Sequence, residues 1–181
     1  MEEYDLVAAC LRGDTEGFRK IVNIFQGSLI AAAFNILGNR EDAEDACQET
    51  FIQAFRHLRD YDARRSFKNW IYIILYRRCL DQVKKKRRFR SAFERAKREA
   101  PLVGAPASDN PGHGRIGDDV LGRLSPKERA AISLWANDGF TAAEISEVLS
   151  CSAATARVTL FNARKKIKSF LENRHAPRGM D

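Results

Sequence analysis

Long apolar segments are absent from this 181-residue sequence. Its longest uninterrupted apolar run, residues 70–76, has seven residues, whereas a membrane-spanning helix needs about 20. The chain begins with the acidic Met1-Glu2-Glu3, and no basic segment precedes an apolar stretch as it would in a signal peptide. We therefore expect a cytoplasmic protein with no direct membrane insertion.

Residues that bind metals or perform covalent catalysis are also scarce. The four cysteines are scattered without a Cys-x-x-Cys motif, and the three histidines are far apart, so neither set has the spacing of a zinc site. The sequence has no glycine-rich phosphate-binding loop and no nucleophile elbow. We expect no metal, no cofactor and no enzymatic activity, and we expect the cysteines to be reduced residues of a core.

Basic residues, in contrast, are abundant. The chain has 31 Lys and Arg against 24 Asp and Glu, a net charge of +7, which favours a polyanionic partner. The excess is concentrated between Arg77 and Glu99, where eleven basic residues oppose three acidic ones, a net +8. This run follows an aromatic segment, residues 67–76. A basic track beside aromatic rings suits single-stranded or distorted DNA, but the rings fit a hydrophobic core equally well, and for Trp70 the core is favoured.

Helical periodicity dominates the first half of the chain. Apolar residues that step by three and four predict an amphipathic helix with Asp14 as its N-cap and Gly38 as its end. These residues are Phe18, Ile21, Phe25, Leu29, Ala32 and Ile36. Asn39 begins a second helix, whose buried side would hold Ala43, Cys47, Phe51, Ala54 and Leu58. No segment has the alternation of a strand flanked by turns, so the predicted fold is all-α.

A change of composition divides the chain. Three prolines and four glycines fall between residues 100 and 117, which is typical of a linker. We therefore predict two small helical domains, residues 1–95 and 118–175, joined by a flexible linker over residues 96–117. The second domain is expected to be a helix-turn-helix.

That helix-turn-helix is predicted from its capping residues. Capping boxes at Ser125–Glu128 and Thr141–Glu144 begin two helices, and Ser152 caps a long basic helix after a tight turn. Its DNA-reading residues are predicted to be Ser152, Thr155, Arg157, Val158, Phe161, Asn162 and Lys165. Phe161 fits two interpretations: contact with thymine methyl groups in the major groove, or packing on the preceding helix.

The helix expected after Asn39 has an acidic outer face. Asp42, Asp45 and Glu49 step by three and four opposite the buried side, and Ile52 continues that face. An exposed apolar residue at the end of an acidic stripe fits a docking surface for a partner helix. A simple solvated face is the alternative.

These pieces, in this order, resemble the sigma-70 family of bacterial transcription initiation factors, and most of all its small extracytoplasmic-function group. The resemblance covers about Tyr4 to Leu171 and fails only in the linker. The residues that carry it are Gly13-Asp14 with Phe18, Leu37-Gly38, Ala43-Glu44-Asp45, Gln48-Glu49, Phe51, Ser66-Phe67, Trp70-Ile71-Tyr72, Leu80-Asp81 with the basic run, Leu124-Ser125, Ala143-Glu144-Ile145, Ser152, Thr155, Leu160 and Ala163-Arg164-Lys165. Each is weak alone, but their order makes the combination specific.

The resemblance implies an alternative sigma factor, which binds core RNA polymerase, directs promoter-specific initiation and melts the promoter. The acidic helix would dock on the β′ clamp helices through Asp42, Asp45, Gln48, Glu49 and Ile52. The helix-turn-helix would read the minus-thirty-five element of promoter DNA while resting on the β flap. An anti-sigma factor that covers the polymerase-binding surfaces is also implied.

The resemblance also implies which segments of the chain contact the minus-ten element. The segment 59–66 would capture a flipped base, and the segment 68–88 would bind and melt the duplex. The implied contacts are Asp60, Arg64, Arg65, Lys68, Asn69, Arg77, Arg78, Lys84, Arg87 and Arg88.

Three positions depart from the family pattern. Arg77 stands where Asn is usual, and Thr159 and Asn162 stand where Arg is frequent. Because fewer guanidinium groups mean less bidentate reading of guanine, we expect an upstream element unlike the commonest one of the group. From the residues alone, two alternatives stay open. One is a stand-alone helix-turn-helix regulator that uses its N-terminal domain to dimerise or to sense a signal, and the other is a basic protein that coats nucleic acid through Lys84–Arg88.

Overall fold

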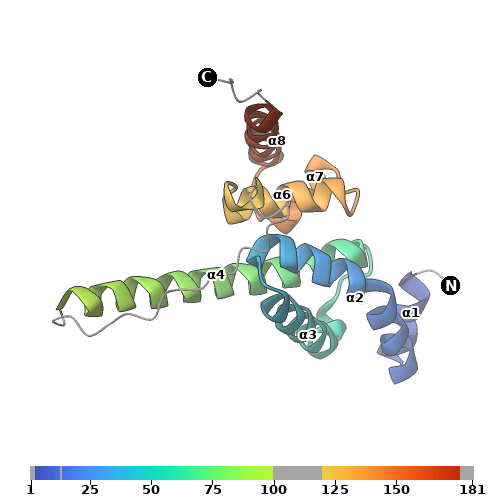
Figure 1. Cartoon of the computed structure of the whole chain (residues 1–181). Coiled ribbons are helices and arrows are strands. Elements are labelled where there is room, and N and C mark those ends of the chain that lie inside the picture. Colours follow the sequence, from blue (N-terminus) through green and yellow to red (C-terminus); the bar gives the residue numbers. More distant parts are fainter. Residues whose placement is uncertain (1–2, 13, 100–119, 176–181) are drawn as a thin grey trace, which may run out of the picture.

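The computed structural model describes residues 3–12, 14–99 and 120–175. Within these ranges the backbone is helical and has no β-strand (Figure 1), which confirms the all-α prediction. The elements are α1 (Glu3–Leu11), α2 (Thr15–Leu37), α3 (Arg40–Arg56), the short 3-10 helix η1 (Leu58–Asp60), α4 (Phe67–Glu99), α6 (Pro126–Ala136), α7 (Ala142–Val148) and α8 (Ala153–His175). The predicted linker from residue 100 onward and Gly13 lie outside the described residues, whereas residues 96–99 continue α4.

Helix α2 begins and ends, and helix α3 begins, at the capping residues predicted from the sequence. The Asp14 carboxylate accepts a hydrogen bond from the Glu16 amide at 2.9 Å, and Asn39 accepts one from the Asp42 amide at 3.0 Å. Gly38 ends α2 with φ +72°, a left-handed conformation that costs a glycine little. The pair Gly38-Asn39 therefore closes one helix and opens the next within two residues.

The apolar stripes of α2 and α3 form the core of the N-terminal half. Ile21, Leu29 and Ala43 are at most 1% exposed. The start of α4 completes this core with Phe67, Ile71, Tyr72, Leu75 and Tyr76, which are all buried. Most rings before the basic run are therefore core residues, and Trp70 is half-buried against this core.

The α2 helix is long and apolar enough to cross a membrane by length and composition alone. In this fold it packs against α1, α3, α4 and α6. Its buried residues are Gly17, Ile21, Phe25, Leu29, Ala32, Ala33 and Ile36. One side of α2 is therefore packed inside the protein.

The four cysteines are free thiols, but the prediction that they are core residues holds only for Cys47 and Cys79, since Cys10 and Cys151 are half-buried. Cys47 and Cys79 are buried, and burial raises the pKa of the Cys47 thiol to about 11 and that of Cys79 to about 12. Because the thiolate is the reactive form, these two groups are chemically inert at neutral pH.

The C-terminal half is held by both predicted capping boxes and by contacts between α6 and α8. Ser125 and Glu128 cap each other reciprocally at the start of α6, and Thr141 and Glu144 do so at α7. Lys166 of α8 donates to the largely buried Glu128 carboxylate at 2.8 Å. These contacts fix α8 across α6 and leave its outer side free for other contacts.

The two halves pack against each other and share one hydrophobic core. α6 lies against α2, and α7 lies against the start of α4 (Figure 1). The Asn35 side chain donates to the Ser133 hydroxyl at 2.9 Å, and the Arg129 guanidinium donates to the Ile36 carbonyl at 3.1 Å. The distal part of α4 projects from this packed body.

Candidate functional site

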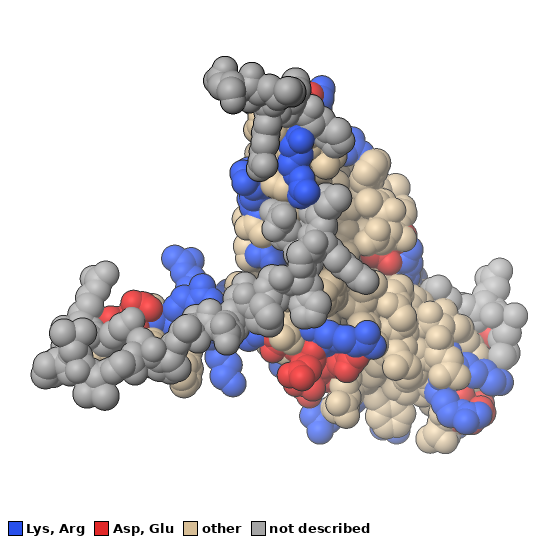
Figure 2. Space-filling view, viewed as in Figure 1, with Lys and Arg blue, Asp and Glu red and all other residues tan. Residues whose placement is uncertain are grey.

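The outer face of α3 is open to solvent at its centre. Asp45 and Gln48 are exposed, and the exposed fraction of Ile52 is 38%. Glu49 is half-buried and accepts a hydrogen bond from Gln53 at 2.9 Å. Figure 2 shows acidic side chains gathered over α3. This part of the predicted docking surface is therefore accessible to a partner helix.

Asp42 differs from the other members of that predicted surface. Its carboxylate pairs with the Lys86 ammonium of α4, and only 24% of its side chain is exposed. The ion pair joins the beginning of α3 to the middle of α4. Asp42 therefore has a structural partner within the chain, which sequence spacing did not indicate.

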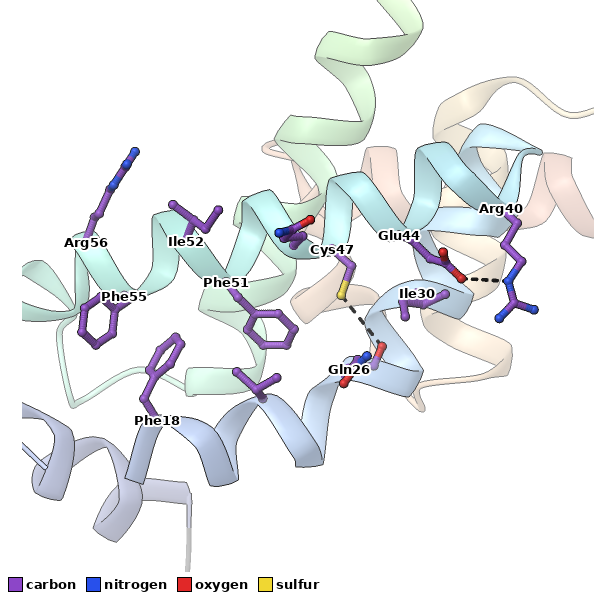
Figure 3. Close-up of a pocket in the computed structure, with 12 residues that line it drawn as sticks. Phe18, Gln26, Ile30, Arg40, Glu44, Cys47, Phe51, Ile52, Phe55 and Arg56 are labelled. Atoms are coloured by element: carbon purple, nitrogen blue, oxygen red, sulfur yellow. Dashed lines mark hydrogen bonds and ion pairs between the residues drawn. The ribbon is translucent and has the colours of Figure 1, made fainter. Parts of the chain in front are cut away.

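A groove of about 830 Å³ runs between α2 and α3 beside the acidic face (Figure 3). Its floor is aromatic: the Phe18 ring lies edge-on to Phe55 with centroids 5.0 Å apart, and to Phe51 at 6.4 Å. The Arg40–Glu44 ion pair, 2.8 Å long, stands at one end. Gln48 and Ile52 line the groove as well as the docking surface. Sequence reasoning missed the groove because Phe55 lies outside the buried stripe of α3.

The first turns of α4 are covered by the C-terminal half. The Lys68 ammonium donates to the Asp138 carbonyl at 2.5 Å, and Asn69 donates to the Glu147 carboxylate at 3.3 Å. The Phe140 ring lies 5.0 Å from the Tyr72 ring and 4.6 Å from the Lys68 ammonium. Two residues predicted to contact the minus-ten element thus contact the other domain. We refer to the contacts that Lys68, Asn69 and Tyr72 make with the C-terminal half as the interdomain contact.

Several polar atoms in this region are buried without full compensation. The Tyr72 hydroxyl donates to Asp138 Oδ1 at 2.5 Å, and burial raises the pKa of both groups. Among the described residues, Asp138 Oδ2, Asn69 Oδ1 and the Tyr76 hydroxyl are buried without a hydrogen-bond partner. Each unsatisfied buried polar group costs about 1–3 kcal/mol. The interdomain contact therefore combines favourable apolar packing with the free-energy cost of these unsatisfied polar atoms.

The loop before α4 presents charged residues to solvent. Arg64 pairs with Asp62 at 2.9 Å, and this hydrogen bonding lowers the pKa of Asp62 to about 2. Asp60 contacts His57 at 3.1 Å, and Arg65 is exposed. The rings of Tyr61, Phe67 and Trp70 lie within 5.4 Å of one another behind the loop. The loop therefore offers cations and partly buried rings next to the start of α4.

The basic residues of α4 follow the projecting part of the helix. Arg77, Lys84, Arg87 and Arg88 are exposed, and Arg78 is half-buried. Figure 2 shows Lys and Arg side chains along this projecting part of α4, which we call the arm. Phe89 and Phe93 are 76% and 53% exposed beside them, and sequence reasoning did not single them out. The arm has the charge to follow a phosphate backbone.

The helix-turn-helix is formed by α7 and the first half of α8. Ser150, with φ +50°, makes the tight turn, and Ser152 caps α8 by accepting from the Thr155 amide at 3.1 Å. All seven residues predicted to read DNA are exposed. Phe161 is 66% exposed, so the alternative that it packs on the preceding helix is wrong.

The part of the chain that the structure describes contains no group of three or more His, Cys, Asp or Glu side chains placed to hold a metal ion. The arrangement instead offers three surfaces: the acidic α3 face, the basic α4 helix and the outer side of α8. These surfaces suit macromolecular binding.

Two family models match the chain in the order expected. The model described as Sigma-70 region 2 matches residues 21–89, and the model described as Sigma-70, region 4 matches residues 118–167. Together they include α3, all the predicted minus-ten contacts and the helix-turn-helix. The basic run up to Arg88 lies inside the first match.

Two relatives of this chain are named as ECF RNA polymerase sigma factors. The chain is 31% identical to the ECF RNA polymerase sigma factor SigE of Mycolicibacterium smegmatis over 147 residues, which cover 77% of this chain and 55% of that one. It is 34% identical to the ECF RNA polymerase sigma factor SigW of Bacillus subtilis over 76 residues, 42% of this chain and 41% of that one. The matched segments thus span about half the length of these relatives.

One solved structure has the same fold over nearly the whole chain. This is the structure of CnrH in complex with the cytosolic domain of CnrY. The superposition covers 94% of this chain and 97% of CnrH, with a TM-score of 0.72 and 24% sequence identity. The likeness includes both helical halves.

Proposed function

Since the chain belongs to the sigma-70 family, in its extracytoplasmic-function group, we propose that it is an alternative sigma factor: it binds core RNA polymerase, directs it to particular promoters and helps to open the start region. The observation that carries the proposal is the presence of region 2 and region 4 in one chain, with the acidic α3 face, the basic α4 and the helix-turn-helix within them. The family match does not favour a stand-alone regulator. In this role the protein makes and breaks no bond itself.

Polymerase binding is assigned to the open part of α3. Asp45 and Gln48 are exposed and Ile52 is partly so, which gives the β′ clamp helices a charged surface with an apolar end. The Phe18–Phe55 groove adjoins this surface and extends its apolar part. Asp42 contributes indirectly, because its partner Lys86 holds α3 against α4.

Minus-ten recognition is assigned to the loop before α4 and to the basic side of α4. A flipped base costs a few kcal/mol in lost stacking, which contacts with rings and cations must offset. Arg64 and Arg65 are exposed in the loop, and Tyr61 and Trp70 are half-buried behind it. The exposed Arg77, Lys84, Arg87 and Arg88 would bind the flanking phosphates.

This function requires the interdomain contact to open. Lys68 and Asn69 cannot bind DNA while they contact Asp138 and Glu147. The polymerase surfaces for region 2 and region 4 are separate in our proposal, so binding both would draw the halves apart. Two weak DNA modules held on one enzyme then act at high effective concentration. Free protein should accordingly bind duplex promoter poorly, and the holoenzyme should bind it well.

An anti-sigma partner and a cytoplasmic location are part of the same proposal. The solved relative CnrH is bound to a second protein, which supports a protein partner for this fold. Such a partner would control the chain by covering the α3 face. A cytoplasmic location follows from the need to meet core RNA polymerase.

The test is in vitro transcription with core RNA polymerase and a genomic promoter pool, with mapped start sites. Adding the protein should create new start sites. Exchanging both Asp45 and Glu49 for Lys should weaken polymerase binding about 100-fold, because it reverses the charge of the surface that is proposed to dock. The control carries the same charge change at the exposed Glu94 and Glu172 and should bind normally.

Two results would reject the proposal. One is that core polymerase neither retains the protein nor starts RNA chains at new positions. The other is tight, sequence-specific binding of a palindromic site by a homodimer of the isolated chain, which fits the stand-alone regulator. Binding without sequence preference and with a steep salt dependence would instead indicate a nucleic-acid coat protein.

A further inference from the structure

The outer side of α8 carries two large apolar residues in the middle of the proposed reading face. Val158 is 58% exposed and Phe161 is 66% exposed. Residues three apart on a helix lie on one face, one turn above the other. The two side chains thus form an apolar pair, which we call the 158/161 pair.

The hydroxyl groups near this pair are already hydrogen-bonded within the helix. The Ser152 hydroxyl accepts from the Thr155 amide at 3.1 Å and lies 2.9 Å from the Thr155 hydroxyl. The Thr159 hydroxyl donates to the Thr155 carbonyl at 2.8 Å. These groups serve the cap and the backbone of α8. They are therefore weak candidates for specific base contacts.

The nearest arginine on the C-terminal side of the pair is also engaged. The Arg164 guanidinium stacks on the Trp135 ring of α6, 3.7 Å from its centroid. Bidentate recognition of guanine needs a guanidinium that extends into the major groove. The stacked Arg164 instead braces α8 against α6.

The charges around the 158/161 pair indicate what kind of partner the pair contacts. Arg157, Lys165 and Lys168 are exposed on the same helix, so the surface attracts a polyanion. In the major groove the apolar group on a base edge is the thymine methyl. Three helical residues rise about 4.5 Å, close to the roughly 3.4 Å between base pairs. A pair on α8 can therefore meet methyl groups on neighbouring base pairs.

We propose that Val158 and Phe161 read thymine methyl groups on adjacent base pairs, so that the upstream promoter element is selected through thymines more than through guanines. The inference rests on the proposed function, since it needs region 4 to face the upstream element. It names the chemistry of that element. Arg157 and Lys165 would bind phosphates on either side, and Asn162 would supply the polar base contact.

The experiment uses holoenzyme assembled from the full chain and core RNA polymerase. Duplexes with a randomised upstream element are selected for binding, and the enriched element is remade with deoxyuridine in place of thymidine, which removes only the methyl groups. Each contacted methyl should contribute about fourfold in affinity, so wild-type holoenzyme should lose roughly 15-fold for two. The Phe161→Ala and Val158→Ala variants should each lose the contribution of one methyl contact, which is about fourfold of the discrimination between thymine and uracil.

Asn162→Ala is the matched control on the same face. It should weaken binding to thymine and uracil duplexes equally and so leave their ratio unchanged. Phe161→Leu should keep part of the discrimination, since it keeps an apolar contact. The substituted residues are exposed, and circular dichroism of each variant checks that α8 is retained.

The outcomes separate this inference from the proposed function. An enriched element that wild-type holoenzyme binds equally with thymine or uracil overturns the inference and leaves the sigma-factor role intact. A Phe161→Ala variant that loses polymerase affinity but keeps wild-type discrimination also overturns it, because the pair would then contact the polymerase. If no element is enriched and polymerase does not bind the chain, the proposed function fails, and this inference fails with it.

Discussion

The outer face of α3 and the first turns of α4 belong to the same domain but differ in access. Asp45 and Gln48 of α3 are exposed to solvent. Lys68 and Asn69 of α4 are bonded to the C-terminal half, and Asn69 is only 8% exposed. A protein partner can reach α3 without moving either half, whereas DNA cannot reach Lys68 or Asn69 until the halves separate.

The difference implies an order of events under the proposed function. Polymerase would bind the open α3 face first, and Lys68 and Asn69 of α4 would become available to DNA afterwards. The following substitutions test this comparison, beginning with the covered side.

Phe140→Ala should have the largest effect. The Phe140 ring is 3% exposed and contacts both Tyr72 and Lys68, and truncating a buried Phe costs about 3–5 kcal/mol. Urea denaturation should show this loss, and amine-reactive labelling of Lys68 should become faster relative to the exposed Lys85. Phe170→Ala, in the same half but with its ring against Arg123, should leave Lys68 labelling unchanged. Equal labelling of Lys68 in wild type and Phe140→Ala would contradict the covering role of Phe140.

Asp138→Ala should have an intermediate effect, because it leaves the Tyr72 hydroxyl without its acceptor. Tyr72 is 1% exposed, and such a group costs about 1–3 kcal/mol. Adding Tyr72→Phe should recover part of the loss, since the stranded hydroxyl is removed. Urea denaturation of both single variants and the double variant gives the coupling energy. Strict additivity would mean that the 2.5 Å hydrogen bond between Tyr72 and Asp138 adds nothing to the interdomain contact.

Lys86→Ala tests the open side and should cost about 0.5 kcal/mol, which is typical of an ion pair near the protein surface. It releases Asp42 from α4. If Asp42 acts only as a brace, polymerase affinity stays unchanged while the free energy of unfolding falls slightly. Lys85→Ala, one residue away and exposed, is the control. A gain in polymerase affinity in Lys86→Ala would place the freed Asp42 in the docking surface.

The smallest effect is a pH dependence at Asp138. Burial raises the pKa of this carboxyl, against the opposing hydrogen bond from Tyr72 and the charge of Lys68. Because the folded state holds the proton more tightly than the unfolded state, the free energy of unfolding rises as the pH falls through the raised pKa, and this gain is lost above it. Urea denaturation between pH 7 and about pH 4 should show wild type gaining stability relative to Asp138→Asn. A constant difference would contradict the raised pKa.

Local features of the fold could be predicted from the sequence. Asp14, Gly38, Asn39 and both capping boxes act within four residues of themselves, and the apolar stripe of α2 depends only on helical spacing. The acidic α3 face and the exposed side of α8 follow from the same periodicity. These parts are determined by short-range geometry, so one sequence suffices to find them.

The interdomain contact could not be predicted in this way. Lys68 and Asp138 are 70 residues apart, and an ammonium group suits a phosphate as well as a carbonyl oxygen. Asp42 resembles its acidic neighbours in sequence, yet the position of Lys86 gives it a separate role. The predicted linker also begins at residue 96, whereas the backbone of α4 continues to Glu99.

The stacking of Arg164 on Trp135 has a spectroscopic consequence. The chain has two tryptophans, one in each half: Trp70 lies in the ring cluster before α4, and Trp135 lies beneath a guanidinium 3.7 Å away. Their emission therefore arises from two chemically distinct settings. With either indole replaced by Phe, the remaining one is an intrinsic fluorescent reporter of its own half, free of any attached dye.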